Sequence, residues 1–249
     1  MFRAFALWLF AFFAAYALAQ TSPRGAFSFR RVEVTDCLDS VPSAEAAGIV
    51  APYKAKVDSL MSPALGLSRV CMSASRPESL LGNWVADVLV EGGTATGLDP
   101  ADMGLINIGA LRSNMPEGIV RQGDIMLIAP FEDCIVVLEL KGSRLLRLMQ
   151  DIAAVGGEGV SSGVRMQITP DGRLLSATID GAEIDPKRIY TVATIDYLAE
   201  GNDGMHALCR ARKRHNIGIP LRDIMMEYVL KHRVIDSKME GRITIAPTL

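Results

Sequence analysis

The chain has 249 residues, of which 49% are hydrophobic, 6% aromatic and 22% charged, and its formal net charge is −2. That length is enough for one large domain or two small ones with a real hydrophobic core, and the composition excludes disorder as a description of most of the chain. A pI near 6.0 also argues against a nucleic-acid-binding protein, which normally carries a basic excess.

The N-terminal 19 residues have the pattern of a signal peptide. Arg3 precedes an uncharged run from Ala4 to Ala19, and seven of the 15 aromatic residues lie within the first 16 positions. The run ends in a small-x-small sequence before Gln20, as signal peptidase requires. A membrane anchor is the alternative, but the run is shorter than the roughly 20 residues that cross a bilayer. We therefore expect cleavage near Ala19, no stable membrane span, and a periplasmic, secreted or cell-surface protein.

Export would make the four cysteines, Cys37, Cys71, Cys134 and Cys209, open to oxidation. Four cysteines allow three pairings, and the sequence does not choose among them. Cys71 and Cys134 lie in apolar runs that predict buried strands, where cysteine more often serves as a small core residue. No C-x-x-C spacing is present, so we expect no zinc site.

The part after the signal peptide begins with a polar stretch. Residues 20–43 are expected to form a linker or N-terminal arm, and residues 44–249 a single domain. Helical spacing predicts a helix over 44–61, with Ala51-Pro52 as a break or a new first turn. A strand is expected over 65–72.

The sequence from Ser75 to Glu78 has the S-x-x-E pattern of a capping box, with Pro77 in the first turn. It predicts the start of a helix that places five apolar side chains on one face. These are Leu81, Trp84, Val85, Val88 and Leu89.

Short strand-like runs and two helices follow. The strands are expected over 103–108, 134–140, 164–169, 174–179, 189–195 and 242–245, and the helices over 144–155 and 221–232. A Pro-Asp-Gly-Arg turn at 170–173 predicts a hairpin between two of the strands. Because the strands come in runs and do not alternate strictly with helices, we expect an α+β domain with a mixed sheet packed with helices.

The sequence offers little for catalysis on its own. The three histidines, His206, His215 and His232, are not in metal-binding arrangements, and there is no G-x-S-x-G elbow or Walker loop. His215 ends a basic run, 210–215, which is either a solvated loop or a phosphate-attracting patch.

Binding is better supported than catalysis. Beyond Phe29 the chain contains one phenylalanine, Phe131, which lies at a proline-containing bend before two acidic residues. Such a ring either plugs the edge of the core or is exposed for stacking a flat ligand. Two loops that follow strands, 107–112 and 201–205, combine glycine with polar side chains, as binding loops often do.

Six ordered motifs together resemble the C-terminal domain of the 5′-nucleotidase family over about residues 45–245. They are E-S-x-L-G-N-x-x-A-D at 78–87, N-x-G-x-x-R at 107–112, P-F at 130–131, E-L-K-G at 139–142, Y-T-V-A-T at 190–194 and G-N-D-G at 201–204. The resemblance implies an α+β domain that binds the nucleoside part of a nucleotide. In that family a separate metallophosphoesterase domain holds two metal ions and cleaves the phosphate.

Carried over to this sequence, the resemblance makes Phe131 a base-stacking ring. It makes Asn107 and Arg112 the polar residues on the ribose or phosphate side, where arginine suits an anion. Asn83 and Asp87 are expected to pack or fix the helix that carries them. Asp203, between glycines, is expected to shape its loop by bonding backbone N–H groups.

Three substrate-side features depart from the family pattern. Met205 stands where relatives with an aromatic sandwich have a second phenylalanine, and a thioether packs more weakly on a purine. Asp133 stands where many relatives have asparagine, and a carboxylate only accepts hydrogen bonds. The acidic residue that some relatives place on the ribose is absent, with Arg210 and Ala211 there instead. We list Phe131, Arg112, Asn107, Met205 and Asp133 as the expected substrate-binding residues.

The family's metal motifs, Asp-x-His, Gly-Asn-His-Asp/Glu and Gly-His-x-His, do not occur in these 249 residues. We therefore expect no catalytic residue, metal or cofactor in this chain. The leading hypothesis is an exported module that binds a nucleoside or nucleoside monophosphate beside a separately encoded metallophosphoesterase, which would hold the two metal ions. The alternatives are a non-enzymatic interaction or scaffold protein with a degenerate pocket, and an autonomous phosphoric ester hydrolase.

Overall fold

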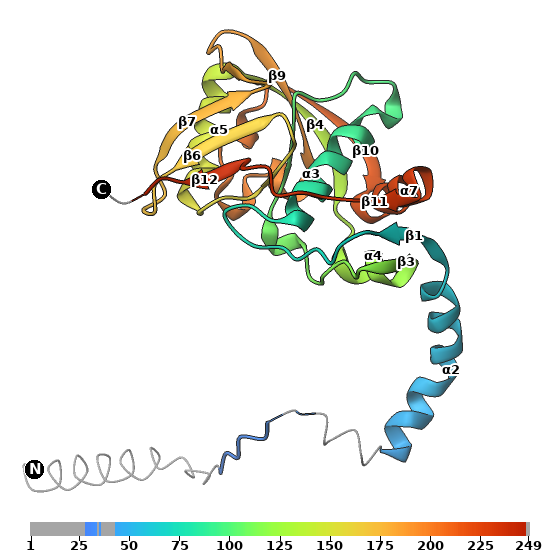
Figure 1. Ribbon diagram of the computed structural model, residues 1–249. Helices are drawn as coiled ribbons and strands as arrows, with labels where there is room; N and C mark the ends of the chain where they lie inside the picture. The colour runs from blue at the N-terminus through green and yellow to red at the C-terminus, as the bar shows by residue number, and fades with distance from the viewer. Residues whose placement is uncertain (1–27, 34, 36–42, 248–249) are drawn as a thin grey trace, which may run out of the picture. The chain divides into compact units, whose positions relative to one another are not determined.

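The computed structural model describes residues 28–33, 35 and 43–247 (Figure 1). The chain divides into two units, Met1–Ala51 and Pro52–Leu249, which are described separately. The predicted signal peptide over 1–19, most of the predicted arm over 20–43, and Cys37 lie outside the described residues. The prediction of one domain beginning at residue 44 stays a prediction.

The first helix, α2 (Ala44–Met61), has the predicted bounds. The expected break at Ala51-Pro52 is wrong, because the helix continues through Pro52. Within the ranges that the structure describes, no helix is long and apolar enough to span a membrane.

A three-stranded sheet follows α2, in the order β11-β1-β3. β1 (Ala64–Ser68) pairs antiparallel with β3 (Gly118–Arg121) and parallel with β11 (Val234–Ile235). β1 is shorter than the predicted strand, which extended to Met72; that residue instead forms an isolated bridge with Met115.

The central sheet has five strands in the order β10-β4-β9-β2-β5. These are β10 (Lys213–Pro220), β4 (Cys134–Lys141), β9 (Ile189–Ile195), β2 (Met103–Ile106) and β5 (Gly159–Val160). β4 runs antiparallel to β9, whereas β2 runs parallel to it. The solvated-loop reading of the basic run is wrong for residues 213–215, which form the start of edge strand β10.

The third sheet has the order β12-β6-β7-β8, and β12, β6 and β7 lie side by side in Figure 1. Its strands are β12 (Ile243–Ile245), β6 (Val164–Ile168), β7 (Leu174–Ile179) and β8 (Ala182–Glu183). Antiparallel pairing of β6 with β7 confirms the predicted hairpin. Because parallel and antiparallel pairs occur together, the prediction of an α+β domain with mixed sheets is confirmed.

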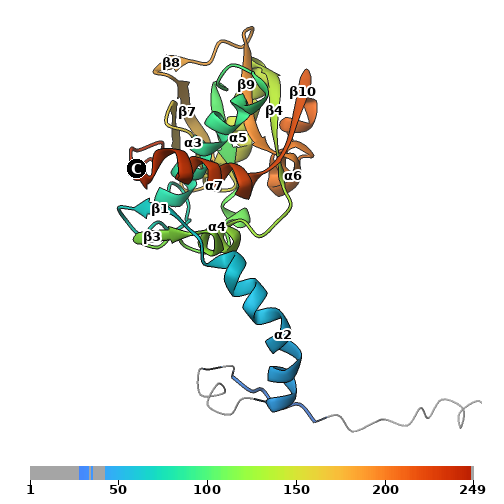
Figure 2. The same cartoon turned by 90° about the vertical axis from the view of Figure 1, so that its right-hand side faces the viewer.

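Helices fill the space between and around the sheets. α3 (Leu80–Gly92) buries its predicted apolar face and packs against α7 (Leu221–His232), which also contacts β1 (Figure 2). The other helices are α4 (Gln122–Ile128), α5 (Gly142–Ala154), α6 (Asp196–Ala199) and the short 3₁₀ turns η2 (Gly93–Thr96), η3 (Ile108–Ala110), η4 (Asn202–Gly204) and η5 (Leu208–Arg210).

The capping box predicted at Ser75 is wrong. The residue that caps α3 is Ser79, whose Oγ accepts a hydrogen bond from the backbone N–H of Gly82 at 3.2 Å. Glu78 is free for another role: its carboxylate accepts the backbone N–H groups of Glu240 and Arg242 at 2.9 and 3.0 Å. The acidic residue therefore holds the C-terminal segment instead of the helix start.

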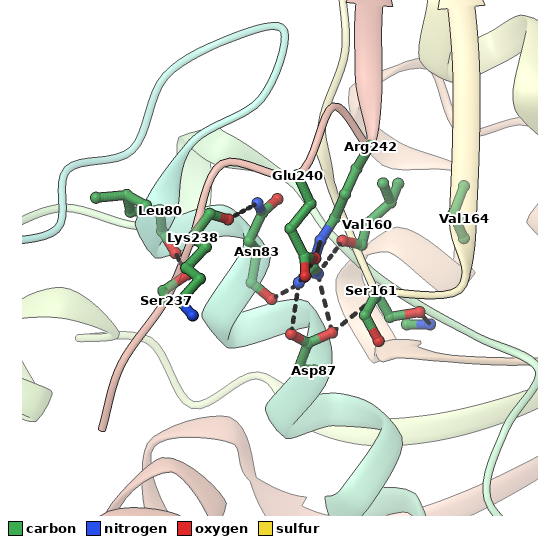
Figure 3. Close-up of polar contacts among 12 residues, drawn as sticks. Leu80, Asn83, Asp87, Val160, Ser161, Val164, Ser237, Lys238, Glu240 and Arg242 are labelled. Carbon is green, nitrogen blue, oxygen red and sulfur yellow. Dashed lines mark hydrogen bonds and ion pairs between the residues drawn. The ribbon is translucent and has the colours of Figure 1, made fainter. Parts of the chain in front are cut away.

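Side chains of α3 bind that C-terminal segment directly (Figure 3). The amide of Asn83 donates to the carbonyl of Lys238 at 2.9 Å. Asp87 forms two parallel hydrogen bonds with the guanidinium of Arg242, at 2.8 and 2.9 Å. The buried Arg242 also donates to the carbonyl of Val160 at 2.8 Å. The expected structural roles of Asn83 and Asp87 are confirmed.

The cysteines differ from the prediction in part. Cys71 is exposed and lies outside the strands, so its expected place in a buried strand is wrong. Cys134 is half-buried at the start of β4, and Cys209 is exposed. Among the described residues these three are free thiols.

Candidate functional site

A pocket of about 390 Å³ lies beside the start of β4 and the ends of β9 and β2 in the central sheet. Four of the five predicted binding residues line it together: Asn107, Arg112, Phe131 and Asp133. Its other lining residues are Gly109, Ala110, Tyr197 and Asp203.

The sheet register explains why these distant residues meet. Ile135 near the start of β4 pairs with Ile195 at the end of β9, so the loop before β4 and the helix after β9 lie at the same end of the strands. β2 runs parallel to β9, so the loop that follows β2 lies at this same end of the strands. Phe131, Tyr197 and Asn107 belong to these three connections.

One carboxylate links the two segments that carry the aromatic rings. Asp196 Oδ1 accepts the backbone N–H of Cys134 at 3.1 Å and that of Tyr197 at 2.9 Å. Because the loop with Phe131 ends at Cys134, this side chain joins the two walls of the pocket through the backbone.

α7 fixes the loop that presents Phe131. The guanidinium of Arg222 donates to the carbonyl of Phe131 at 3.1 Å and to the carboxylate of Glu132 at 2.5 Å. The hydrogen bond with Glu132 raises the pKa of Arg222 above its ordinary value. The backbone N–H of Leu221 donates to the carbonyl of Asp133 at 2.9 Å. The backbone of the loop is thus held in place, and Phe131 is 46% exposed.

A hydrogen-bonded chain of three side chains forms the opposite wall. Asn107 Nδ2 donates to Asp203 Oδ2 at 2.6 Å, and the hydroxyl of Tyr197 donates to Asp203 Oδ1 at 3.0 Å. The hydrogen bond to Asp203 raises the pKa of Tyr197. Asp203 has φ of 53° between Gly201 and Gly204. Its expected role was to bond backbone N–H groups; instead it orients two side chains of the pocket.

Asn107 contributes an acceptor that no described residue satisfies. The residue is 3% exposed, and its Oδ1 is buried without a hydrogen-bond partner. A buried polar atom without a partner costs about 1–3 kcal/mol. A ligand that donates a hydrogen bond to Oδ1 would recover that cost.

Glu158, which no sequence motif indicated, holds the loop that carries Asn107. Glu158 Oε2 accepts the backbone N–H of Ile108 at 2.5 Å, and the same buried carboxylate pairs with Arg76. Burial raises the pKa of Glu158, and the hydrogen bonds from Ile108 and Arg76 offset this only in part.

Arg112 supplies positive charge at the pocket. Its Nη1 donates to the carbonyl of Gly109 at 3.2 Å, and it forms no ion pair with any residue that the structure describes. An exposed guanidinium with most of its donors unused suits an anion such as phosphate.

Met205 does not line the pocket, contrary to its expected role as the second stacking group. Its side chain is fully buried in the core. The second ring at the pocket comes from Tyr197, which is 41% exposed. The sequence held a signal for it, because Tyr197 is one of only six aromatic residues between positions 44 and 249 and directly follows a predicted strand.

No histidine is among the described residues that line this pocket. His215 Nε2 is 3.4 Å from Glu139, and His232 Nε2 is 3.1 Å from Glu91. Across residues 28–33, 35 and 43–247, no group of three or more His, Cys, Asp or Glu side chains could hold a metal ion. The described residues therefore do not fit the two metal ions of the family, and no metal-dependent step is assigned to them.

Comparison with known proteins identifies the domain. The family described as "5′-nucleotidase, C-terminal domain" matches residues 56–210. The chain belongs to this family. The 5′-nucleotidase C-terminal fold is also found in a solved 5′-nucleotidase precursor from Thermus thermophilus, with a TM-score of 0.74 and 24% identity over 85% of this chain. Membership supports a nucleotide-related role for the domain and confirms the resemblance on which the sequence analysis relied.

Relatives of this 5′-nucleotidase C-terminal domain are much longer proteins. Protein UshA of Yersinia enterocolitica is 27% identical over 143 residues, which are 55% of this chain and 26% of UshA. An apyrase of Tabanus yao is 28% identical over 166 residues, which are 59% of this chain and 30% of the apyrase. This chain likewise covers 45% of the Thermus thermophilus protein.

Proposed function

We propose that this protein is an exported nucleotide- or nucleoside-binding module of a split 5′-nucleotidase-like system in nucleotide catabolism. The observation that carries the proposal is the pocket in which Phe131 and Tyr197 both expose their rings beside the unsatisfied Oδ1 of Asn107. Flat apolar surface and an unfilled acceptor together suit a nucleoside.

The aromatic part of the pocket suits the base. Stacking on an aromatic side chain is worth roughly 1–3 kcal/mol per base. The loop that carries Phe131 is held through its backbone, and the ring of Tyr197 is held through its hydroxyl. Restricting the loop and this ring before binding lowers the entropic cost of association.

The polar part suits the sugar and phosphate. A ribose hydroxyl can donate to the unsatisfied Oδ1 of Asn107, and Arg112 can pair with a monophosphate. Two acidic residues, Asp133 and Asp203, line the same pocket beside this one arginine. Repulsion by those carboxylates favours a nucleoside or monophosphate over ligands with more negative charge.

Hydrolysis would take place on a separate protein. The 249 residues contain none of the family's metal motifs, and the described side chains do not form a metal site. A separately encoded metallophosphoesterase would supply both metal ions and the reaction, and the predicted signal peptide would bring this chain to the same compartment.

Calorimetry with adenosine, guanosine and their monophosphates tests the binding proposal. We expect binding by the wild-type chain and a loss of at least about tenfold in affinity in Phe131→Ala. Leu175→Ala is the matched control, because it removes an exposed apolar side chain from β7, away from the pocket. No binding by the wild type, or equal binding by Phe131→Ala, would contradict the proposal.

Co-purification from the native periplasm or cell surface tests the split system. We expect a metallophosphoesterase to co-purify with this chain and to release phosphate from nucleotides faster in its presence. Phosphate release by this chain alone would contradict the assignment of catalysis to a partner.

A further inference from the structure

The pocket holds hydrogen-bond acceptors that protein groups leave unused. The side chain of Asp133 receives no hydrogen bond or ion pair from any residue in the described ranges, although it lines the pocket. Asn107 adds its buried, unsatisfied Oδ1. By contrast, both oxygens of Asp203 are already bonded, to Asn107 and Tyr197.

Asp133 is placed to meet the edge of a base that stacks on Phe131. Glu132 turns to Arg222, whereas Phe131 and Asp133 both line the pocket. A base that stacks on Phe131 would therefore present its in-plane donors inside the pocket that Asp133 also lines.

The donor pattern at a base edge decides which base an ionised carboxylate accepts. Guanine carries two adjacent donors, N1–H and the 2-amino group, and a carboxylate with two acceptor oxygens can bind both. Adenine places its amino group beside the lone pair of N1, and hypoxanthine places N1–H beside the carbonyl O6. With adenine one carboxylate oxygen would face the lone pair of N1, and with hypoxanthine it would face either the lone pair of O6 or the C2–H, which is no conventional donor. An unmatched polar contact in a binding site is costly.

We propose that Asp133 is a specificity-determining residue that makes this pocket prefer guanine nucleosides to adenine and hypoxanthine nucleosides. The inference rests on the proposed nucleoside binding and extends it to the identity of the base. An amide at this position would lose the preference, because its oxygen and its amino group can match the mixed donor and acceptor edge of adenine or hypoxanthine.

Calorimetry on the full chain at pH 8 with guanosine, inosine and adenosine tests the assignment. Inosine differs from guanosine only by lacking the 2-amino group, so the comparison isolates one of the two donors. We expect guanosine to bind about tenfold or more tightly than either of the others, since the site would leave a polar group unmatched with those ligands. In Asp133→Asn, a nearly isosteric change, we expect guanosine to lose this advantage.

The outcomes separate this inference from the binding proposal. Equal or tighter binding of adenosine or inosine by the wild type would overturn the guanine assignment and leave nucleoside binding intact. Retention of the guanosine preference in Asp133→Asn would show that another residue selects the base. Absence of binding by all three nucleosides would overturn both proposals. The comparison of the three nucleosides with the wild-type chain tests the guanine preference even if Asp133→Asn does not fold. Circular dichroism would detect such a loss of folding.

Discussion

The hydroxyl of Tyr197 and the carboxylate of Asp203 lie 3.0 Å apart and join helix α6 to the glycine-rich turn that follows it. Asp203 holds Asn107 through its other oxygen. The aromatic and the polar sides of the pocket are thus connected through a single carboxylate.

Two substitutions of Tyr197 separate the contribution of its hydroxyl, which bonds Asp203, from that of its ring, which would stack on a base. Tyr197→Phe keeps the ring but removes the hydrogen bond to Asp203, so we expect a loss of a few-fold in nucleoside affinity. Tyr197→Ala removes the stacking surface as well, and we expect at least about tenfold weaker binding. Titration of both variants with the same nucleoside checks the order; a larger loss in Tyr197→Phe would show that the ring does not stack.

Arg112 is expected to distinguish a monophosphate from its nucleoside. Arg112→Gln removes the charge but leaves an amide, and a charge-assisted hydrogen bond is worth about 1.5–3 kcal/mol. We therefore expect roughly tenfold or greater loss of affinity for the monophosphate and little change for the nucleoside. The ratio of the two dissociation constants, measured in the same buffer, gives the answer. An equal loss for both ligands would assign Arg112 to the loop structure instead.

The raised pKa of Glu158 makes the free energy of unfolding depend on pH. The folded state holds this proton more tightly than the unfolded state, in which the pKa is close to the ordinary 4.5. The resulting stabilisation is complete below that value and disappears as the pH rises through the folded-state pKa. We expect the free energy of unfolding of the wild type, relative to Glu158→Gln, to fall over this window. Urea unfolding at several pH values measures the difference, and a relative rise with pH would contradict the assigned direction.

The ion pair between Arg242 and Asp87 is expected to matter for stability. Arg242 has a side chain only 4% exposed and bonds to α3 and β5, so Arg242→Met leaves the partly buried Asp87 without its partner. Breaking a buried pair in this way costs about 3–5 kcal/mol, and we expect the lower end because Asp87 is 32% exposed.

The matched control is Arg173→Met, which breaks an exposed pair with Asp171. An exposed pair contributes little to stability because water and salt screen it, so we expect almost no change in the free energy of unfolding. Chemical denaturation of both variants provides the comparison. Similar effects at the two sites would show that the C-terminal segment is not held by Arg242.

Local sequence pattern predicted the bounds of several elements. α7, β7 and β9 have the bounds that periodicity indicated. β10 was missed because its first residues, Lys213 to His215, are charged or polar and lie on an edge strand, where little is buried. The cap of α3 was misplaced because Ser75 and Ser79 both fit a capping pattern, and the backbone fold selects the second.

The residues of the pocket were also predicted only in part from the sequence. Phe131, Asn107, Arg112 and Asp133 could be named from motifs, because each stands at a recognisable loop. The choice between Met205 and Tyr197 could not be made in this way. The turn at Asp203 directs Met205 into the core, and strand pairing brings Tyr197 to the pocket. Both are consequences of register, which depends on contacts between residues far apart in the sequence.

The double role of Asp196 has a consequence for how a ligand would enter. Because this carboxylate bonds the main chain of both segments, the separation of the two backbone segments that carry Phe131 and Tyr197 is set by folding and not by the ligand. Rigid partners change shape little on association, so we expect the heat capacity change of binding to reflect the apolar area that the base and the pocket bury, without a contribution from ordering of the loops. A ligand would then enter by turning side chains, while the main chain around the pocket stays as folded.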